Sequence, residues 1–195
     1  AHPFIRGTAQ NPDTHFQARE AANKYYESVP GIVQSLMDEF AQVVGRQYHL
    51  VEYHGDPEAT EVMVCMGSGA RTIEHTINRL NAQGHKLGLV ELHLFRPLPA
   101  AEIVRAIPET ARTVAVLDRT KEPGSNGEPL FLDVLAALSE AHSRGTRNNM
   151  PIVSGGRYGI SSKEFTPGMV AGIAAELELE PVSYTHLTLP TIYSV

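Results

Sequence analysis

The stretch Glu61-Val-Met-Val-Cys-Met66, followed at once by Gly67-Ser68-Gly69, decides the fold class of this chain. A short apolar run that ends at glycines is typical of a buried strand. After the glycines, the sequence predicts a helix over residues 70–83, which ends at Gly84. A buried strand that passes through a tight turn into a helix begins a β–α–β unit.

The same alternation of strand and helix continues toward the C-terminus. We predict strands at residues 87–95, 113–117 and 151–153, and helices at residues 100–107, 129–143 and 167–177. Strands separated by helices, with short turn-rich connections, indicate a mostly parallel sheet with helices on both faces, and right-handed crossovers follow as the default. The predicted fold class is therefore α/β and doubly wound, and no internal repeat is visible.

A helical segment precedes the predicted sheet. Residues 1–30 are polar and rich in turn formers, with one helix predicted at residues 16–27. A second helix is predicted over residues 31–44, where Gly45 ends it. This helix is amphipathic, because its apolar side chains fall on one face: Ile32, Val33, Leu36, Met37, Phe40, Val43 and Val44.

The composition excludes several classes of protein. Hydrophobic residues make up 42% of the chain and charged residues 19%, the balance of an ordinary globular protein. A net charge of −6 without a basic block argues against nucleic-acid or anionic-membrane partners, and no apolar run is long enough to cross a bilayer. Cys65 is the only cysteine, which excludes a disulfide framework and any iron–sulfur cluster held by this chain alone. A reducing cytoplasm fits this cysteine content.

Three predicted strand ends carry residues that could bind a ligand, since ligands of such sheets gather at the carboxyl ends of the strands. The first, Met66 to Gly69, could hold an anion on exposed N–H groups, but it is only half of a dinucleotide fingerprint, and tight packing is the favoured interpretation. The second runs from Asp118 to Gly124 and on to Pro129. Its charged residues suggest either an anion-binding loop or, as we favour, ion pairing at a domain interface.

The third strand end is the glycine-rich segment from Ser154 to Gly159. Here Arg157 could pair with a carboxylate or a phosphate, and a structural turn and a functional contact are equally supported. Elsewhere, His49 and His54 are expected on opposite faces of a strand, and no catalytic triad or phosphate-binding loop occurs. We therefore predict no catalytic residue and no metal site.

Three motifs resemble the pyruvate:ferredoxin (flavodoxin) oxidoreductase family. The first resembles the end of that family's first domain, and the other two resemble its second domain. In order they are His2-Pro-Phe-Ile-Arg-Gly-Thr-Ala-Gln-Asn-Pro-Asp13 with Phe16-Gln-Ala-Arg-Glu-Ala-Ala-Asn23, Val116-Leu-Asp-Arg-Thr-Lys-Glu-Pro-Gly124 with Gly127-Glu-Pro-Leu130, and Gly155-Gly-Arg-Tyr-Gly159 with Ser162-Lys-Glu-Phe-Thr-Pro167. The resemblance extends over residues 1–180.

The resemblance implies an enzyme that oxidatively decarboxylates pyruvate to acetyl-CoA and passes electrons to ferredoxin or flavodoxin. It also implies thiamine diphosphate, Mg²⁺ and 4Fe–4S clusters, a homo-oligomer, and a second domain similar to the transketolase C-terminal domain. The family holds thiamine diphosphate between domains that this chain lacks, so no catalytic residue is carried over. Arg119, Lys121 and Arg157 become candidate contacts with the remaining domains of the same enzyme. The alternatives are the same domain of another 2-oxoacid:acceptor oxidoreductase, or a non-catalytic α/β binding module.

We expect three parts in the chain. Residues 1–46 would be the end of the first, pyrimidine-binding type domain with a linking helix, and residues 47–181 the transketolase-like domain. Residues 182–195 would be a non-native tail, because Val182 to Thr191 is the translation of GTC-TCT-TAT-ACA-CAT-CTG-ACG-CTG-CCG-ACG, which resembles a sequencing adapter. The alternative is a genuine segment whose Thr, Val, Tyr and Ile favour strands.

Overall fold

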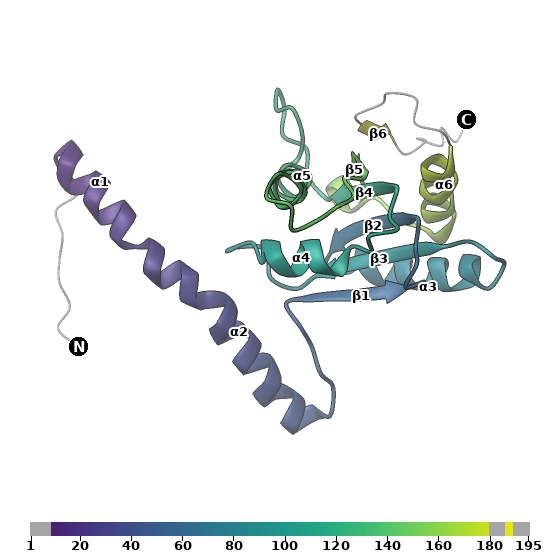
Figure 1. Cartoon of the computed structure of the whole chain (residues 1–195), viewed down its shortest axis with the longest axis horizontal. Coiled ribbons are helices and arrows are strands. Elements are labelled where there is room, and N and C mark those ends of the chain that lie inside the picture. Colours follow the sequence, from purple (N-terminus) through teal and green to yellow (C-terminus); the bar gives the residue numbers. More distant parts are fainter. Residues whose placement is uncertain (1–8, 180–185, 189–195) are drawn as a thin grey trace. The chain divides into compact units, whose positions relative to one another are not determined.

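The computed structural model describes residues 9–179 and 186–188 (Figure 1). The chain forms two compact units, residues 1–47 and residues 48–195. Residues 2–8 of the first family motif and most of the expected tail lie outside the described residues. No helix among the described residues is long and apolar enough to cross a membrane.

The first unit consists of two helices, α1 (Pro12–Ala21) and α2 (Asn23–Val44). The predicted helix boundary at Pro30 is wrong, because α2 continues through Pro30 and Gly31. A proline inside a helix removes one backbone hydrogen bond, and on an exposed helix water can bond the carbonyl that is released. The predicted end is confirmed, since Gly45 takes the left-handed conformation with φ 73°.

The second unit is a six-stranded sheet flanked by helices, in the strand order β1-β3-β2-β4-β5-β6. Neighbouring strands are parallel except at β1, which pairs antiparallel with β3. The predicted α/β fold with a mostly parallel sheet is therefore confirmed. The elements are β1 (Val51–Gly55), β2 (Glu61–Met66), α3 (Gly69–Asn81), β3 (Leu87–Leu92), α4 (Ala100–Ala106), β4 (Thr113–Asp118), α5 (Pro129–Ser143), β5 (Ile152–Arg157), a 3₁₀ turn η1 (Ile160–Ser162), α6 (Pro167–Glu178) and β6 (His186–Thr188).

Helices cover both faces of the sheet, as a doubly wound fold requires (Figure 1). Alternate residues of β2 point in opposite directions, so Val62 and Val64 enter one core while Met63 and Cys65 enter the other. The first core is completed by α4 and α5 and the second by α3 and α6. Because both faces of β2 are buried, the strand reads as a continuous apolar run.

The glycine-rich segment from Ser154 to Gly159, for which the sequence supports a structural turn and a functional contact equally, is strand as far as Arg157, so β5 extends beyond the strand predicted at residues 151–153. Glycines are rare in strands, and for that reason the sequence suggested a turn. The structure shows why glycine is needed, because a Cβ atom on Gly155 would lie 3.1 Å from Cγ of Phe131 in α5. Gly155 is therefore explained by the lack of space for a side chain, and not by a turn conformation.

A buried arginine closes the C-terminal end of α4. The guanidinium of Arg147 donates to the carbonyl oxygens of Ile107 and Pro108, both at 2.8 Å, and to that of Asn149 at 2.7 Å. A helix leaves its last carbonyls without intrahelical partners, and a cation at that end also interacts favourably with the helix dipole. Arg147 is 2% exposed, so water cannot replace it.

Replacing Arg147 by methionine should lower the free energy of unfolding by about 2–4 kcal/mol, because several buried carbonyls lose their donor. The matched control is Arg144→Met. The side chain of Arg144 is 73% exposed and forms an exposed ion pair with Glu140 four residues away, so its loss should cost less than about 0.5 kcal/mol. Urea denaturation of the three proteins measures both changes. Equal effects at the two positions would contradict the role given to Arg147.

Candidate functional site

Of the three basic residues singled out in the sequence, Lys121 and Arg157 meet at one carboxylate near the carboxyl ends of β4 and β5, whereas Arg119 makes a separate contact. Nη1 of Arg157 lies 2.8 Å from Oε1 of Glu128, and Nζ of Lys121 lies 3.6 Å from the same oxygen. Glu128 is 4% exposed, directly before α5. Arg157 thus pairs with a carboxylate, one of the two partners expected for it, and that carboxylate belongs to the same chain.

The electrostatics of Glu128 follow from these neighbours. Burial acts to raise the pKa of its carboxyl, but the hydrogen bond from Arg157 and the charges of Lys121 and Arg157 outweigh burial, so the pKa lies below its usual range. The second oxygen, Oε2, is buried and has no hydrogen-bond partner among the described residues. Glu128 is therefore an ionised anchor with spare accepting capacity.

Arg119 joins the loop after β4 to the loop after β5. Its Nε donates to the carbonyl of Gly159 at 3.0 Å. Gly159 has φ 60°, and a Cβ atom there would lie 2.9 Å from Nε of Arg119, so both its conformation and its contact require glycine. Ser161 and Ser162 also have positive φ, which is uncommon for serine and marks a tightly constrained loop.

Asp118, the last residue of β4, fixes the start of α5. Its two carboxylate oxygens accept from the backbone N–H groups of Leu130 and Phe131, each at 3.0 Å. Burial raises the pKa of this carboxyl, and the two N–H groups oppose that effect. The charged loop between Asp118 and Glu128 is thus held at both ends by buried carboxylates, whose role the sequence did not reveal.

The crevice at the topological switch point is filled by a side chain. From β2 the chain turns to β3 on one side and then to β4 on the other, so β2 and β4 flank the place where such sheets bind ligands. Tyr158 is 6% exposed there, with its Oη 3.3 Å from Sγ of Cys65 and 3.3 Å from the carbonyl of Met66. A Cβ atom on Gly69 would lie 2.6 Å from that hydroxyl.

This packing confirms the favoured interpretation of the glycine turn from Met66 to Gly69, whose glycine makes room for a tyrosine ring. The thiol beneath the ring is unreactive as well as buried. Burial, above all other influences, raises the pKa of Cys65 to about 11, so it is protonated at neutral pH. Cys65 is therefore a core residue and no nucleophile.

A groove of about 660 Å³ lies between α4 and α5, at the opposite end of the strands from these loops. Its lining is largely aliphatic, from residues such as Ala101 and Val104. Arg147 also lines it, but its donors are already bonded to backbone carbonyls. Of the other charged residues in the lining, Arg144 pairs with Glu140, and Glu109 accepts from the backbone N–H of Asn149.

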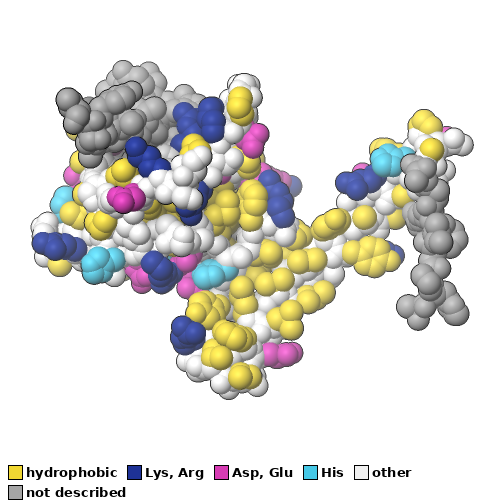
Figure 2. Space-filling view, turned by 180° about the vertical axis from the view of Figure 1, so that it is seen from behind, with side chains coloured by type: hydrophobic (Ala, Val, Ile, Leu, Met, Phe, Trp, Pro, Cys, Tyr) yellow, Lys and Arg dark blue, Asp and Glu magenta, His cyan; other side chains and the backbone are white. Residues whose placement is uncertain are grey.

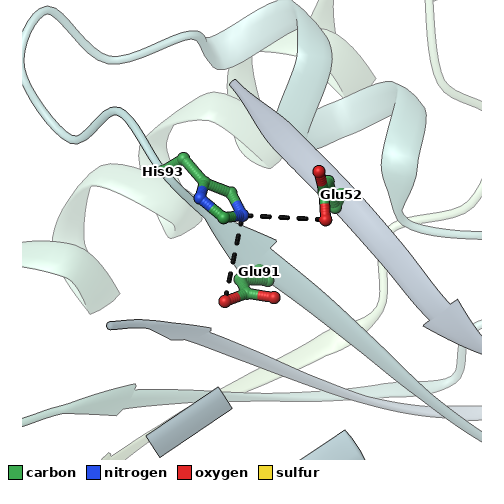
Figure 3. Close-up of side chains that lie close together, drawn as sticks. All are labelled: Glu52, Glu91 and His93. Carbon is green, nitrogen blue, oxygen red and sulfur yellow. Dashed lines mark ion pairs between the residues drawn. The ribbon is translucent and has the colours of Figure 1, made fainter. Parts of the chain in front are cut away.

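A second polar cluster lies on β1 and β3, where the sequence predicted nothing. Nearly the same pentapeptide occurs in both places, as Leu50-Val-Glu-Tyr-His54 and as Leu89-Val-Glu-Leu-His93, which is a short repeat within the sequence. The antiparallel register places Glu52 directly opposite Glu91. Nε2 of His93 lies 3.7 Å from Oε2 of Glu52 and 3.8 Å from Oε1 of Glu91 (Figure 3).

The other half of the pentapeptide cluster contacts α3. Nε2 of His54 lies 3.3 Å from Oε2 of Glu91, its Nδ1 lies 3.4 Å from Glu74, and Arg71 forms a short ion pair with the same Oε2 of Glu91. His54 is within β1 but His49 precedes it, so the expected placement of both histidines on one strand is wrong. Burial, above all, lowers the pKa of His93.

The comparisons with known proteins point to one family. Residues 59–159 match the family model of pyruvate:ferredoxin oxidoreductase core domain II. The pyruvate-flavodoxin oxidoreductase of Trichormus variabilis is 56% identical over 187 residues, which cover 96% of this chain and 15% of that protein. The pyruvate:ferredoxin oxidoreductase of Moorella thermoacetica is 51% identical over 172 residues, which cover 88% of this chain and 14% of that protein.

A solved structure supports the fold alone. The 2-oxoglutarate:ferredoxin oxidoreductase of Magnetococcus marinus, with 2-oxoglutarate, coenzyme A and succinyl-CoA bound, matches 87% of this chain and 24% of that chain with a TM-score of 0.51 and 19% identity. The chain spans only about 15% of the length of the relatives it matches. Because the family model matches more than half of its residues, the chain belongs to the pyruvate:ferredoxin oxidoreductase family.

Proposed function

We propose that this chain is a segment of an enzyme that oxidatively decarboxylates pyruvate to acetyl-CoA and passes the electrons to flavodoxin or ferredoxin. The support is the identity of about half of its residues to proteins named for this reaction with pyruvate. Another 2-oxoacid is the second candidate. The likeness to a 2-oxoglutarate enzyme concerns the fold, at 19% identity, and so does not favour that substrate.

The segment itself serves as a scaffold between other domains and does not hold the catalytic centre. The observation that carries this proposal is the position of Tyr158, which occupies the crevice where an α/β sheet of this type would bind a cofactor. Thiamine diphosphate and Mg²⁺, which we expect in the whole enzyme, do not fit that filled crevice. Iron–sulfur clusters do not fit this chain either, because its single cysteine is buried in the core.

The loops after β4 and β5 form the proposed interdomain surface. Their charges are fixed within the domain by Glu128 and Gly159, which orients Arg119, Lys121 and Arg157 before any partner arrives. The side chain of Lys121 is 45% exposed, so its ammonium group can also form an ion pair with a carboxylate of another domain. Preorganised cations lose less side-chain entropy on contact than mobile ones.

The first unit offers a different kind of contact surface. Neither α1 nor α2 has a buried residue, although hydrophobic side chains run along α2 (Figure 2). The helical spacing of Ile32, Leu36 and Val43 places these three on one face. Val43 is 84% exposed. A 22-residue helix with an exposed apolar stripe is typical of a segment that packs against further protein. This stripe supports the enzyme-segment proposal and argues against a free-standing binding module.

The division at residues 46 and 181 and the cytoplasmic location remain part of the proposal. A buried free cysteine is compatible with a reducing compartment. His186–Thr188 of the expected tail pairs with β5, and the rest of residues 182–195 lies outside the described residues. Sequencing the DNA that encodes this chain would test whether the tail is native. We expect adapter bases from the codon of Val182 onward, and an intact gene without them would refute that origin.

Purified alone, this chain should show no pyruvate-dependent reduction of an electron acceptor, because the proposed catalytic centre lies outside it. The assay supplies pyruvate, coenzyme A, thiamine diphosphate and Mg²⁺, and follows the reduction of methyl viologen anaerobically. The pyruvate:ferredoxin oxidoreductase of Moorella thermoacetica, assayed in parallel, is the positive control. Measurable turnover by the chain itself would show that it holds a complete active site.

Glu128→Gln should destabilise the domain in a pH-dependent way. The pKa of Glu128 is lower in the folded chain, so its carboxylate contributes stability above the ordinary glutamate value of about 4.3 and loses that contribution as the pH falls through the folded-state pKa. The difference in unfolding free energy between wild type and variant should therefore be largest above about pH 5 and shrink in acid.

The control for this series is Glu122→Gln, an exposed glutamate of the same loop. Its effect should stay below about 0.5 kcal/mol at every pH. Urea unfolding curves between about pH 3 and pH 7 measure both variants across the glutamate range. A difference for Glu128→Gln that is independent of pH would contradict the ion pairs as the cause.

A further inference from the structure

We propose that the paired pentapeptides of β1 and β3 form a binding site for Zn²⁺, with Glu52, Glu91 and His93 as its protein ligands. One potential ligand atom from each of these residues lies within 4.8 Å of the other two. The set combines an imidazole nitrogen with two carboxylate oxygens, all of which are common zinc ligands. Three protein ligands leave one position for water or a further group.

The first argument is the register of the two strands. Like charges directly opposite each other on antiparallel strands are destabilising, and Glu52 faces Glu91 in this way. Glu91 is 5% exposed, so solvent screens this repulsion poorly. A cation between the two carboxylates turns the repulsion into attraction. Because β1 is held in the sheet by β3, the same ion would join the edge strand to the sheet.

The second argument is the balance of charge. The described cluster contains three carboxylates, from Glu52, Glu74 and Glu91, but one permanent cation, Arg71. The formal charges of these four residues, with the histidines left aside, sum to −2, which a divalent ion would balance. The ion pairs of the cluster join residues of β1, β3 and α3, together with His93 just after β3.

The third argument is that the two carboxylate oxygens of Glu91 have different partners. Oε2 contacts Arg71 and His54, whereas Oε1 is directed to His93 (Figure 3). A ligand carboxylate is commonly held by hydrogen bonds to its other oxygen, and that outer contact orients it. Arg71 and His54 thus position Glu91, and the open half of the cluster is at His93, whose side chain is 22% exposed.

The site is tested on the full chain, treated with a chelator and titrated with Zn²⁺ in a calorimeter. We expect one equivalent to bind and to raise the melting temperature. Glu52→Gln and His93→Asn should each weaken binding by at least about tenfold, as loss of a ligand costs no less than loss of its supporting contacts. His85→Asn is the matched control, since His85 pairs with a single carboxylate, Glu178, outside the cluster.

Spectroscopy of the unaltered chain makes the result independent of how well the variants fold. Co²⁺ in place of Zn²⁺ should give the visible absorption of a low-coordinate site with nitrogen and oxygen ligands, and Zn²⁺ should shift the ring nitrogen resonances of His93 without shifting those of His85. Absence of stoichiometric binding would overturn the proposal. So would a His85→Asn variant that loses as much affinity as His93→Asn, or ring shifts confined to other histidines.

Discussion

Burial of β2 on both faces is the constraint on which the second unit depends. A strand whose successive side chains enter two separate cores needs a helical layer on each side, and α3 with α6 and α4 with α5 supply these layers. The crossovers that place those helices also make the sheet parallel and bring the loops after β2, β4 and β5 to one edge. The contacts that Asp118, Glu128 and Tyr158 each make with neighbouring loops follow from that arrangement.

That edge has the position of a ligand site but the chemistry of a packed interior. Tyr158 takes up the crevice, and Glu128 pairs with Arg157 and Lys121, two of the cations that could have bound an anion. The same fold can therefore serve as a scaffold in one protein and as a cofactor domain in another, because the site depends on a few side chains at the strand ends. In this chain the side chains at the strand ends connect the loops after β2, β4 and β5 to one another.

Much of the fold could be predicted from the sequence because its strands and helices have strong periodicities of their own. β2 and α5 begin and end where the apolar pattern and the glycines and prolines indicated. The errors at Pro30 and Gly155 have another origin. Proline disfavours the interior of a helix, but α2 continues through Pro30, where the helix is exposed. Glycine disfavours strands, but Gly155 lies in β5, where the ring of Phe131 in α5 leaves little room for a side chain.

The candidate sites were less predictable for a related reason. The positions of Arg119, Lys121 and Arg157 near strand ends could be predicted. The pairing of Glu128 with Lys121 and Arg157 could not, nor could the filling role of Tyr158, because both depend on contacts between distant parts of the chain. Glu52 and Glu91 carry a signal in the repeated pentapeptide, yet only the antiparallel pairing of β1 with β3 makes them neighbours. A parallel pairing or another register would separate them.

The position of β1 also has a consequence for synthesis on the ribosome. β1 emerges first of all the strands, but the sheet accepts it only through β3, which emerges after β2 and α3. Until then its backbone donors and acceptors have no strand to pair with, and its carboxylate at Glu52 faces water. The earliest strand of the nascent domain thus waits without a partner while β2 and α3 are made, which leaves an unpaired edge during elongation. Such an edge is a natural target for a chaperone that recognises extended chain.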